Sequence, residues 1–192
     1  SQANFPTALT GTCRYDNIIQ VDTDNEGAAE KMTTLLIGKG FRRFAFLVKD
    51  MSYNVDRKRH EGFCRALIKN GISEKDQLFY NGSIRMEFLD AIIENIKNKK
   101  VECIICGDDE ICTMVMSRLQ AEGYRIPKDV AIASLYNSTN LDCYSPAVTA
   151  VSVAASQMGG TAVRQLIQRL RGENYEKKTM LDYDILFRKS TN

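Results

Sequence analysis

The sequence predicts an α/β fold with a mostly parallel sheet, because short apolar runs alternate with segments of helical periodicity. The clearest example spans residues 101–137. Within it, the apolar run 103–106 predicts a strand buried on both faces, and residues 130–133 predict a second buried strand. Between them, a helix is expected to follow a cap at Asp108 or Asp109 and to end at Gly123. These three segments form a βαβ unit with parallel strands and a right-handed crossover.

Polar side chains follow both strands of this unit. Asp108 follows the first strand, and Tyr136 and Asn137 follow the second. In open parallel sheets, ligands bind beyond the carboxyl ends of the strands. We therefore expect these three residues at one edge of the sheet, where a ligand site can form.

The part of the chain before this unit shows the same alternation. Asp24, Asn25 and Glu26 are typical of a helix start, and Gly38 and Gly40 are typical of its end. Strands are expected at residues 5–9, 18–21, 44–48 and 78–80, and helices at 24–38, 57–69 and 86–97.

After the unit, residues 147–153 predict a further strand and residues 155–171 predict a long helix. Residues 180–187 alternate apolar and polar side chains, with Asp182 and Asp184 among the polar ones. A period of two indicates one strand with a solvated face. The whole chain therefore consists of repeated βα units.

The overall charge argues against a nucleic-acid-binding surface on this chain. The formal net charge is +2, with 44% hydrophobic and 26% charged residues, as in an ordinary globular protein. Basic residues cluster at 57–59 and 97–100, where we expect solvated helix faces. No apolar run reaches the ~18 residues of a membrane span, and the first residues lack the order of a signal peptide.

The six cysteines do not predict a metal site. Cys103 and Cys106 spell C-x-x-C, but residues three apart on a strand point to opposite faces and cannot hold one ion. His60 is the only histidine. We therefore expect buried, reduced thiols and a cytoplasmic protein.

Motifs for cofactor binding and covalent catalysis are missing from the sequence. It contains no G-x-G-x-x-G, no phosphate-binding loop and no G-x-S-x-G, so we expect no cofactor. Asp108 and Asp109 could form an acid/base or magnesium pair, which keeps an enzymatic alternative open. The other interpretation is one helix cap and one solvated charge, and Asp109 fits the role of the cap better than Asp108.

Six short phrases occur in order between residues 23 and 159. They read TDNE at 23–26, GFRRFAF at 40–46, RHEGF at 59–63, CGDDE at 106–110, GYRIPKDV at 123–130 and SPAVTAV at 145–151, with MG at 158–159. Together they resemble V-D-N-E, G-H-R-R-I-A-F, R-x-x-G-F, A-x-N-D-x, G-x-x-V-P-x-D-V and P-P-L-T-T-V followed by M-G. These are phrases of the lactose-repressor/galactose-repressor (LacI/GalR) family of bacterial transcription regulators.

The resemblance implies a two-lobed, periplasmic-binding-protein-like (type I) fold with parallel doubly wound sheets. Residues 23–152 and 179–192 would form the C-terminal lobe, and residues 1–22 and 154–178 would be a remnant of the N-terminal lobe. The DNA-binding headpiece of the family and the first βα units of its N-terminal lobe have no counterpart in the sequence. We therefore expect this chain to be part of a longer protein.

The resemblance also implies an effector site in the cleft of the fold. Arg59 matches the arginine that grips effector oxygens, Asp108 matches a ligand-facing residue, and Asn137 ends the next ligand-facing phrase. Tyr136 stands where the family often has an acid that binds a sugar. A phenol offers one donor and a stacking face, so this departure favours an aromatic or less hydroxylated ligand. Tyr53 is a further candidate for the wall of the site.

By the same resemblance, the chain is the effector-binding and dimerisation domain of a non-catalytic regulator. It would sense a sugar or nucleobase-like metabolite and act on operator DNA only through the missing headpiece. An alternative with the same fold is a solute-binding protein of a sugar uptake system, which requires a signal peptide and fits poorly with six cysteines. Family dimers pair through segments that correspond here to Met114, Arg118, Ala121, Cys143 and Tyr144.

Overall fold

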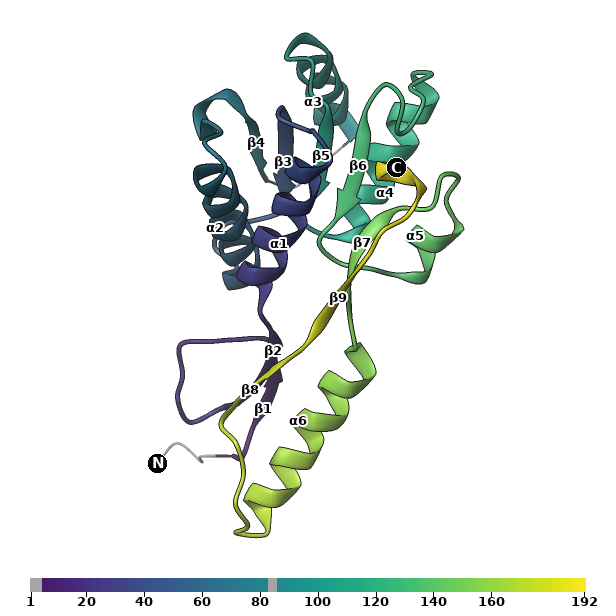
Figure 1. The fold of residues 1–192 in the computed structure, drawn as a ribbon. Helices are drawn as coiled ribbons and strands as arrows, with labels where there is room; N and C mark the ends of the chain where they lie inside the picture. Colours follow the sequence, from purple (N-terminus) through teal and green to yellow (C-terminus); the bar gives the residue numbers. More distant parts are fainter. Residues whose placement is uncertain (1–4, 83–85) are drawn as a thin grey trace. The chain divides into compact units, whose positions relative to one another are not determined.

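The computed structural model describes residues 5–82 and 86–192, which fold into two compact units. The larger unit comprises Asn25–Ser152 and Asp184–Asn192, and the smaller unit comprises Ser1–Asp24 and Val153–Tyr183 (Figure 1). Both units contain parallel strands and helices, which confirms the predicted α/β fold.

The larger unit is built on a six-stranded sheet with the order β4-β3-β5-β6-β7-β9 (Figure 1). The pairs β3/β4, β3/β5, β5/β6 and β6/β7 are parallel. Every residue of the three central strands is buried, because helices cover both faces of the sheet. The strands are β3 (Phe44–Val48), β4 (Leu78–Asn81), β5 (Cys103–Cys106), β6 (Ala131–Ser134), β7 (Thr149–Val153) and β9 (Tyr183–Leu186).

Alternate residues of the strands face two different helix layers. Ala45, Leu47 and Ile104 join the core formed with α3 (Met86–Asn98) and α4 (Asp109–Ala121). Phe46 points to the other face and stacks on Phe63 of α2 (Asn54–Lys69), with ring centroids 4.6 Å apart. The same layer contains α1 (Asn25–Gly38). The unit also contains α5 (Thr139–Cys143) and the 3₁₀ turns η1 (Glu74–Asp76) and η2 (Lys189–Thr191).

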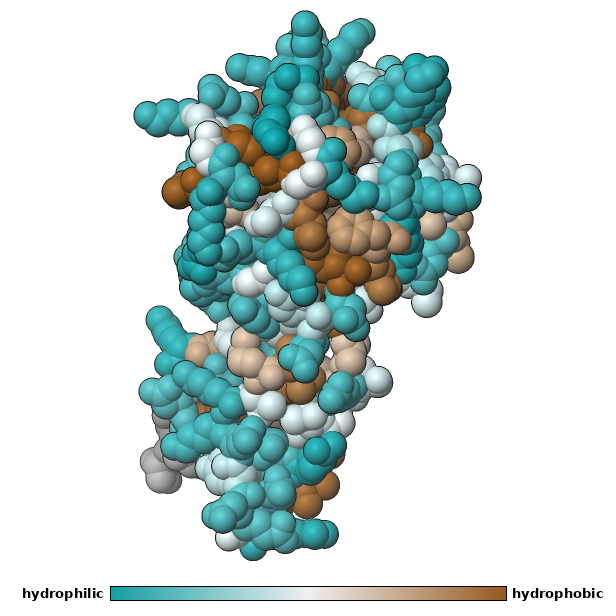
Figure 2. All heavy atoms as spheres, viewed as in Figure 1, coloured by the Kyte–Doolittle hydropathy of each residue, from teal (hydrophilic) through white to brown (hydrophobic). Residues whose placement is uncertain are grey.

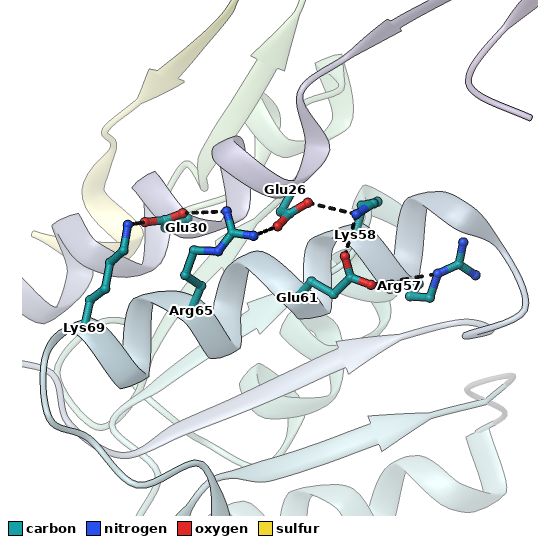
Figure 3. Close-up of polar contacts among 7 residues, drawn as sticks. All are labelled: Glu26, Glu30, Arg57, Lys58, Glu61, Arg65 and Lys69. Carbon is teal, nitrogen blue, oxygen red and sulfur yellow. Dashed lines mark hydrogen bonds and ion pairs between the residues drawn. The ribbon is translucent and has the colours of Figure 1, made fainter.

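Helices α1 and α2 approach so closely that only glycine fits at one position. A Cβ atom on Gly62 would lie 2.0 Å from the carbonyl oxygen of Glu26. An ion-pair ladder lies alongside this contact (Figure 3). In it, Lys58 and Arg65 both pair with Glu26, and Lys69 Nζ lies 2.6 Å from Glu30 Oε1. The basic cluster at 57–59 is thus only partly a solvated face.

The smaller unit contains a three-stranded parallel sheet with β2 (Ile19–Thr23) between β1 (Ala8–Thr10) and β8 (Lys178–Leu181). Helix α6 (Ala155–Leu170) packs against β1 and β2. Its Ala162 is buried, but three apolar residues on this helix, Val163, Ile167 and Leu170, are exposed.

Two expectations about individual elements are wrong. Residues 180–187 do not form one strand, because β8 joins the sheet of the smaller unit and β9 joins that of the larger unit. The alternation of residues 180–187 also places Phe187 on the apolar face, yet this residue is 38% exposed. Helix α5 was not predicted, because five residues are too few for a periodic signal.

Polar side chains cover most of the visible face of the larger unit, with apolar patches between them (Figure 2). Leu35, Leu186 and Phe187 are among its exposed apolar residues. Lys39 Nζ lies 4.9 Å from the centroid of the Phe187 ring, so a cation partly covers this ring. Among the described helices, none combines the length and apolar character needed to cross a membrane.

Candidate functional site

Three polar side chains follow the ends of three neighbouring strands of the larger sheet. Leu47 of β3 pairs with Cys106 of β5, and Cys106 pairs with Ser134 of β6. Lys49, Asp108 and Tyr136 each lie two residues beyond one of these paired positions. The register therefore brings them to the same carboxyl edge of the sheet, where ligands of parallel sheets bind.

Asp108 uses both of its carboxylate oxygens in the folded chain. Its Oδ1 atom accepts a 2.9 Å hydrogen bond from the backbone N–H of Ile111, which caps the first turn of α4. Its Oδ2 atom lies 2.9 Å from Lys49 Nζ. Asp108 thus caps α4 and at the same time lies at the end of β5, where a ligand can bind.

The sequence alone did not single out Lys49, although it directly follows a buried strand. Besides Asp108, it pairs with Glu110 at 2.5 Å. Burial lowers the pKa of Lys49, but the hydrogen bonds and charges of Asp108 and Glu110 outweigh burial, so the pKa lies above its ordinary value. The site therefore contains a fixed ammonium group at neutral pH.

Arg59 lies on α2 and reaches the same edge. Its side chain is buried, and Nη1 donates a 2.7 Å hydrogen bond to the carbonyl oxygen of Gly107. Gly107 is the residue before Asp108, so the guanidinium group is held next to the turn between β5 and α4. At Gly107 a Cβ atom would lie 3.0 Å from Val48 Cγ1, so this turn also packs closely on β3.

The loop between β3 and α2 is held by side-chain acceptors. Asp56 accepts a 3.0 Å hydrogen bond from the backbone N–H of Asp50. Asp50 in turn accepts one of 2.8 Å from Ser52, and hydrogen bonds from Ser52 lower the pKa of Asp50. Tyr53 lies at the end of this loop and is 60% exposed. Its role as a wall of the site stays a prediction.

Tyr136 and Asn137 form the turn after β6. Ser134 Oγ donates a 2.7 Å hydrogen bond to the carbonyl oxygen of Tyr136, which fixes this turn. Tyr136 is half-buried. Asn137 is not directed only toward a ligand, because its Oδ1 atom accepts a 3.0 Å hydrogen bond from Arg188 Nη1. Arg188 follows β9 and is 51 residues away from Asn137, so no local sequence pattern predicts this contact.

The side chains that could serve as metal ligands do not lie together in the described residues. The described ranges, 5–82 and 86–192, contain no group of three or more His, Cys, Asp or Glu side chains arranged for a metal ion. His60 packs against Phe46 and Phe79 instead. At Asp108, a lysine and a helix N-terminus occupy the oxygens that the magnesium alternative requires.

All six cysteines are free thiols, and Cys103, Cys106 and Cys112 are buried. Burial raises the pKa of Cys103 and of Cys106 well above its ordinary range, so both are thiols at neutral pH. Cys106 belongs to the core around α3 and α4, whereas Cys103 does not. The two side chains therefore face opposite sides of β5, as expected for a strand.

The five residues expected at a dimer interface line two adjacent surface hollows. The two hollows share Thr113 and Tyr144 as lining residues, and the volumes of the hollows are about 750 and 360 Å³. The Tyr144 hydroxyl lies 3.1 Å from Ser117 Oγ. Of the expected residues, Cys143 and Tyr144 line the larger hollow, and Met114, Arg118, Ala121 and Tyr144 line the smaller one.

Known proteins of similar sequence and structure are transcription regulators. The chain is 26% identical over 178 residues to the HTH-type transcriptional regulator CelR of Thermobifida fusca, covering 91% of this chain and 52% of that protein. Among solved structures, the transcription regulator CcpA of Lactococcus lactis matches with a TM-score of 0.88 and 26% identity, covering 97% of this chain and 70% of the other. A complex of the regulator CelR with cellobiose matches with a TM-score of 0.82 and 25% identity, covering 96% and 57%.

This chain spans between 45% and 59% of the length of such curated relatives. Residues 33–191 match the family described as periplasmic binding protein-like domain, which is most of the sequence. With this match and the similarity to regulators, the chain belongs to the periplasmic-binding-protein-like domains of LacI/GalR-type transcription regulators.

Proposed function

We propose that this chain is the effector-binding part of a transcription regulator and takes a small metabolite at the carboxyl edge of β3, β5 and β6. The observation that carries the proposal is the row formed by Lys49, Asp108 and Tyr136, with Arg59 held beside it through Gly107. These groups offer charged donors, an acceptor and an aromatic face, which suits recognition of a polar ring.

The chemistry of the row favours a ligand with few paired hydroxyl groups. Both oxygens of Asp108 already accept from the protein, and Tyr136 supplies a phenol at the second strand end. A phenol can donate one hydrogen bond and stack on a flat or ring-shaped molecule. We therefore propose a sugar with an apolar ring face or a nucleobase-like molecule. The cellobiose complex of a related regulator supports the sugar class in general, although cellobiose itself carries more hydroxyl groups than this row favours.

The two compact units correspond in this proposal to the lobes of a regulator. The larger unit is the C-terminal lobe, with Tyr53 and Asn137 as further effector residues, and the smaller unit is the part of the N-terminal lobe that this chain contains. The full protein would bind operator DNA in the cytoplasm through a helix-turn-helix headpiece, as the name of the HTH-type relative suggests. The effector acts only through its different affinity for two conformations, without catalysis.

Ligand-induced stabilisation tests the effector site. The purified chain is heated with a panel of monosaccharides, cellobiose and free nucleobases. A true effector at ~100 times its dissociation constant stabilises the fold by about 2.7 kcal/mol, which raises the melting temperature measurably. We expect Tyr136→Ala and Asp108→Asn to reduce this shift.

Tyr175→Ala is the matched control, because Tyr175 is a half-buried tyrosine of the smaller unit and contacts Arg169. It should leave the ligand-induced shift unchanged. The proposal fails if no compound of the panel raises the melting temperature, or if the shift survives both site substitutions.

We also propose that two copies of the chain associate through the hollows over α4 and α5. The expected interface residues come from two segments, α4 and the end of α5, yet line this one surface. A tyrosine, a methionine and an arginine around small residues are a composition typical of interfaces.

Sedimentation should show a dimer that Ala121→Glu dissociates. Ile68→Glu places the same charge on an exposed position of α2 and should not change the mass. An unchanged dimer in Ala121→Glu would exclude this surface.

A further inference from the structure

Arg188 lies after β9 and connects three parts of the larger unit. Its side chain is 17% exposed. Nη1 donates to Asn137 Oδ1 at 3.0 Å and to the carbonyl oxygen of Val148 at 2.5 Å, and Nη2 forms an ion pair with Asp142 of α5. One planar guanidinium group thus holds the turn after β6, the start of β7 and helix α5 together.

The backbone of the tail keeps this guanidinium group in place. The backbone N–H of Arg188 donates to Thr149 Oγ1 at 2.9 Å. Two residues later, Ser190 Oγ donates to the carbonyl oxygen of Ile132 at 2.6 Å and accepts from the backbone N–H of Thr149 at 2.8 Å. Ser190 and Thr149 are fully buried. The arginine is therefore anchored to β6 and β7, and its side chain cannot move without disturbing its partners.

The two side-chain partners of Arg188 lie at the two surfaces discussed above. Asn137 directly follows Tyr136 at the carboxyl edge of β6. Asp142 directly precedes Cys143 and Tyr144, which line the larger hollow. We propose that Arg188 is a positioning residue that couples the Asn137 turn to the surface formed by Asp142, Cys143 and Tyr144.

The rigid geometry of the Arg188 guanidinium group explains why a change at Asn137 affects Asp142. Its nitrogens lie in one plane, so a shift that improves one hydrogen bond moves the donors of the others. A ligand that binds the Asn137 amide competes with Nη1 for the same acceptor, and the position of Asp142 changes in response. That the Asn137 turn belongs to a ligand site, and the Asp142 surface to a subunit contact, rests on the proposed function. The coupling between the two places does not.

Nuclear magnetic resonance on the ligand-free, full 192-residue chain tests the coupling. The side-chain amide of Asn137 is assigned by its loss in Asn137→Asp. We expect Asp142→Asn to shift this amide resonance in the wild-type background and to leave it in place in an Arg188→Lys background, because lysine keeps the charge but loses the planar fork. Glu173→Gln is the matched control, since it removes another exposed carboxylate near an arginine. It should not move the Asn137 amide.

The coupling is overturned if Asp142→Asn leaves the Asn137 amide in place, or if it shifts this amide equally in the wild-type and Arg188→Lys backgrounds. If Arg188→Lys does not fold, a double-mutant cycle of Asn137→Ala and Asp142→Asn keeps Arg188 intact. Additive losses in melting temperature would then argue against the coupling. A chain that shows the Arg188-dependent shift but binds no sugar or nucleobase retains the coupling and loses only the proposed effector site.

Discussion

Lys49 Nζ lies 2.9 Å from Oδ2 of Asp108, and this ion pair joins the ends of β3 and β5. The lysine side chain is 39% exposed and that of the aspartate 22%, so the pair is partly shielded from water. Since Asp108 also caps α4, the pair connects the edge of the sheet to the start of a helix. It gives the proposed site a fixed geometry before any ligand binds.

Loss of the lysine should destabilise the fold modestly. We expect Lys49→Gln to lower the free energy of unfolding by ~0.5–1 kcal/mol, because partly exposed ion pairs are screened by solvent. Urea unfolding at low and high salt measures this, and the difference from wild type should shrink at high salt. Lys178→Gln removes a more exposed lysine, 3.5 Å from Asp16, and should have a smaller effect. Equal losses for both variants would contradict a special role of Lys49.

Two substitutions at Asp108 separate capping from charge. Asp108→Ala removes the acceptor of the Ile111 N–H and should cost about 1 kcal/mol more than Asp108→Asn, because asparagine caps helices as well as aspartate does. Both variants lose the ion pair with Lys49. Chemical denaturation gives the two free energies of unfolding. If alanine and asparagine destabilise equally, the cap contributes nothing and the charge alone matters.

Local signals in the sequence were enough to predict the strand–helix units and a helix cap at Asp108 or Asp109. They favoured Asp109 for the cap, whereas Asp108 is the residue that caps α4. The run 103–106, the aspartate after it and the apolar spacing of α4 lie within one short segment, so their interactions are local. Lys49 and Arg188 were missed because their partners are distant in the sequence and only the sheet register brings them together.

The prediction of one strand over residues 180–187 failed for a different reason. Its alternating pattern is the same in β8 and β9, and a period of two does not reveal that the chain leaves one sheet and enters another near Asp182. The buried face of α4 was also predicted only in part. Helical spacing places Met114 and Arg118 on one face with Ile111, Val115 and Leu119. Both are nevertheless partly exposed, while Cys112 and Met116 are buried.

The contact between α1 and α2 predicts strong intolerance at Gly62. A Cβ atom there would overlap the Glu26 carbonyl oxygen at 2.0 Å, so the helices must separate. We expect Gly62→Ala to cost more than ~2 kcal/mol, as overpacking does. Thermal and urea unfolding measure the loss.

Gly159 provides the control for this substitution. It lies inside α6, and a Cβ atom there meets no other atom within 4 Å. Since alanine favours helices over glycine by ~1 kcal/mol, Gly159→Ala should be neutral or stabilising. A Gly62→Ala variant as stable as Gly159→Ala would show that the two helices can separate at little cost.

His60, the only histidine, should make stability depend on pH below neutrality. It packs against Phe46 and Phe79, and burial lowers its pKa below the ordinary value of 6.5, although Glu74 and Glu61 partly oppose this. The unfolded chain therefore binds a proton at this residue more readily than the folded chain does. Its contribution to stability is present above about pH 6.5 and is lost as the pH falls through the pKa of the folded state. Urea unfolding between about pH 5 and 7.5 should show this decrease, and His60→Gln should flatten it. An unchanged slope in His60→Gln would assign the pH dependence to the carboxylates instead.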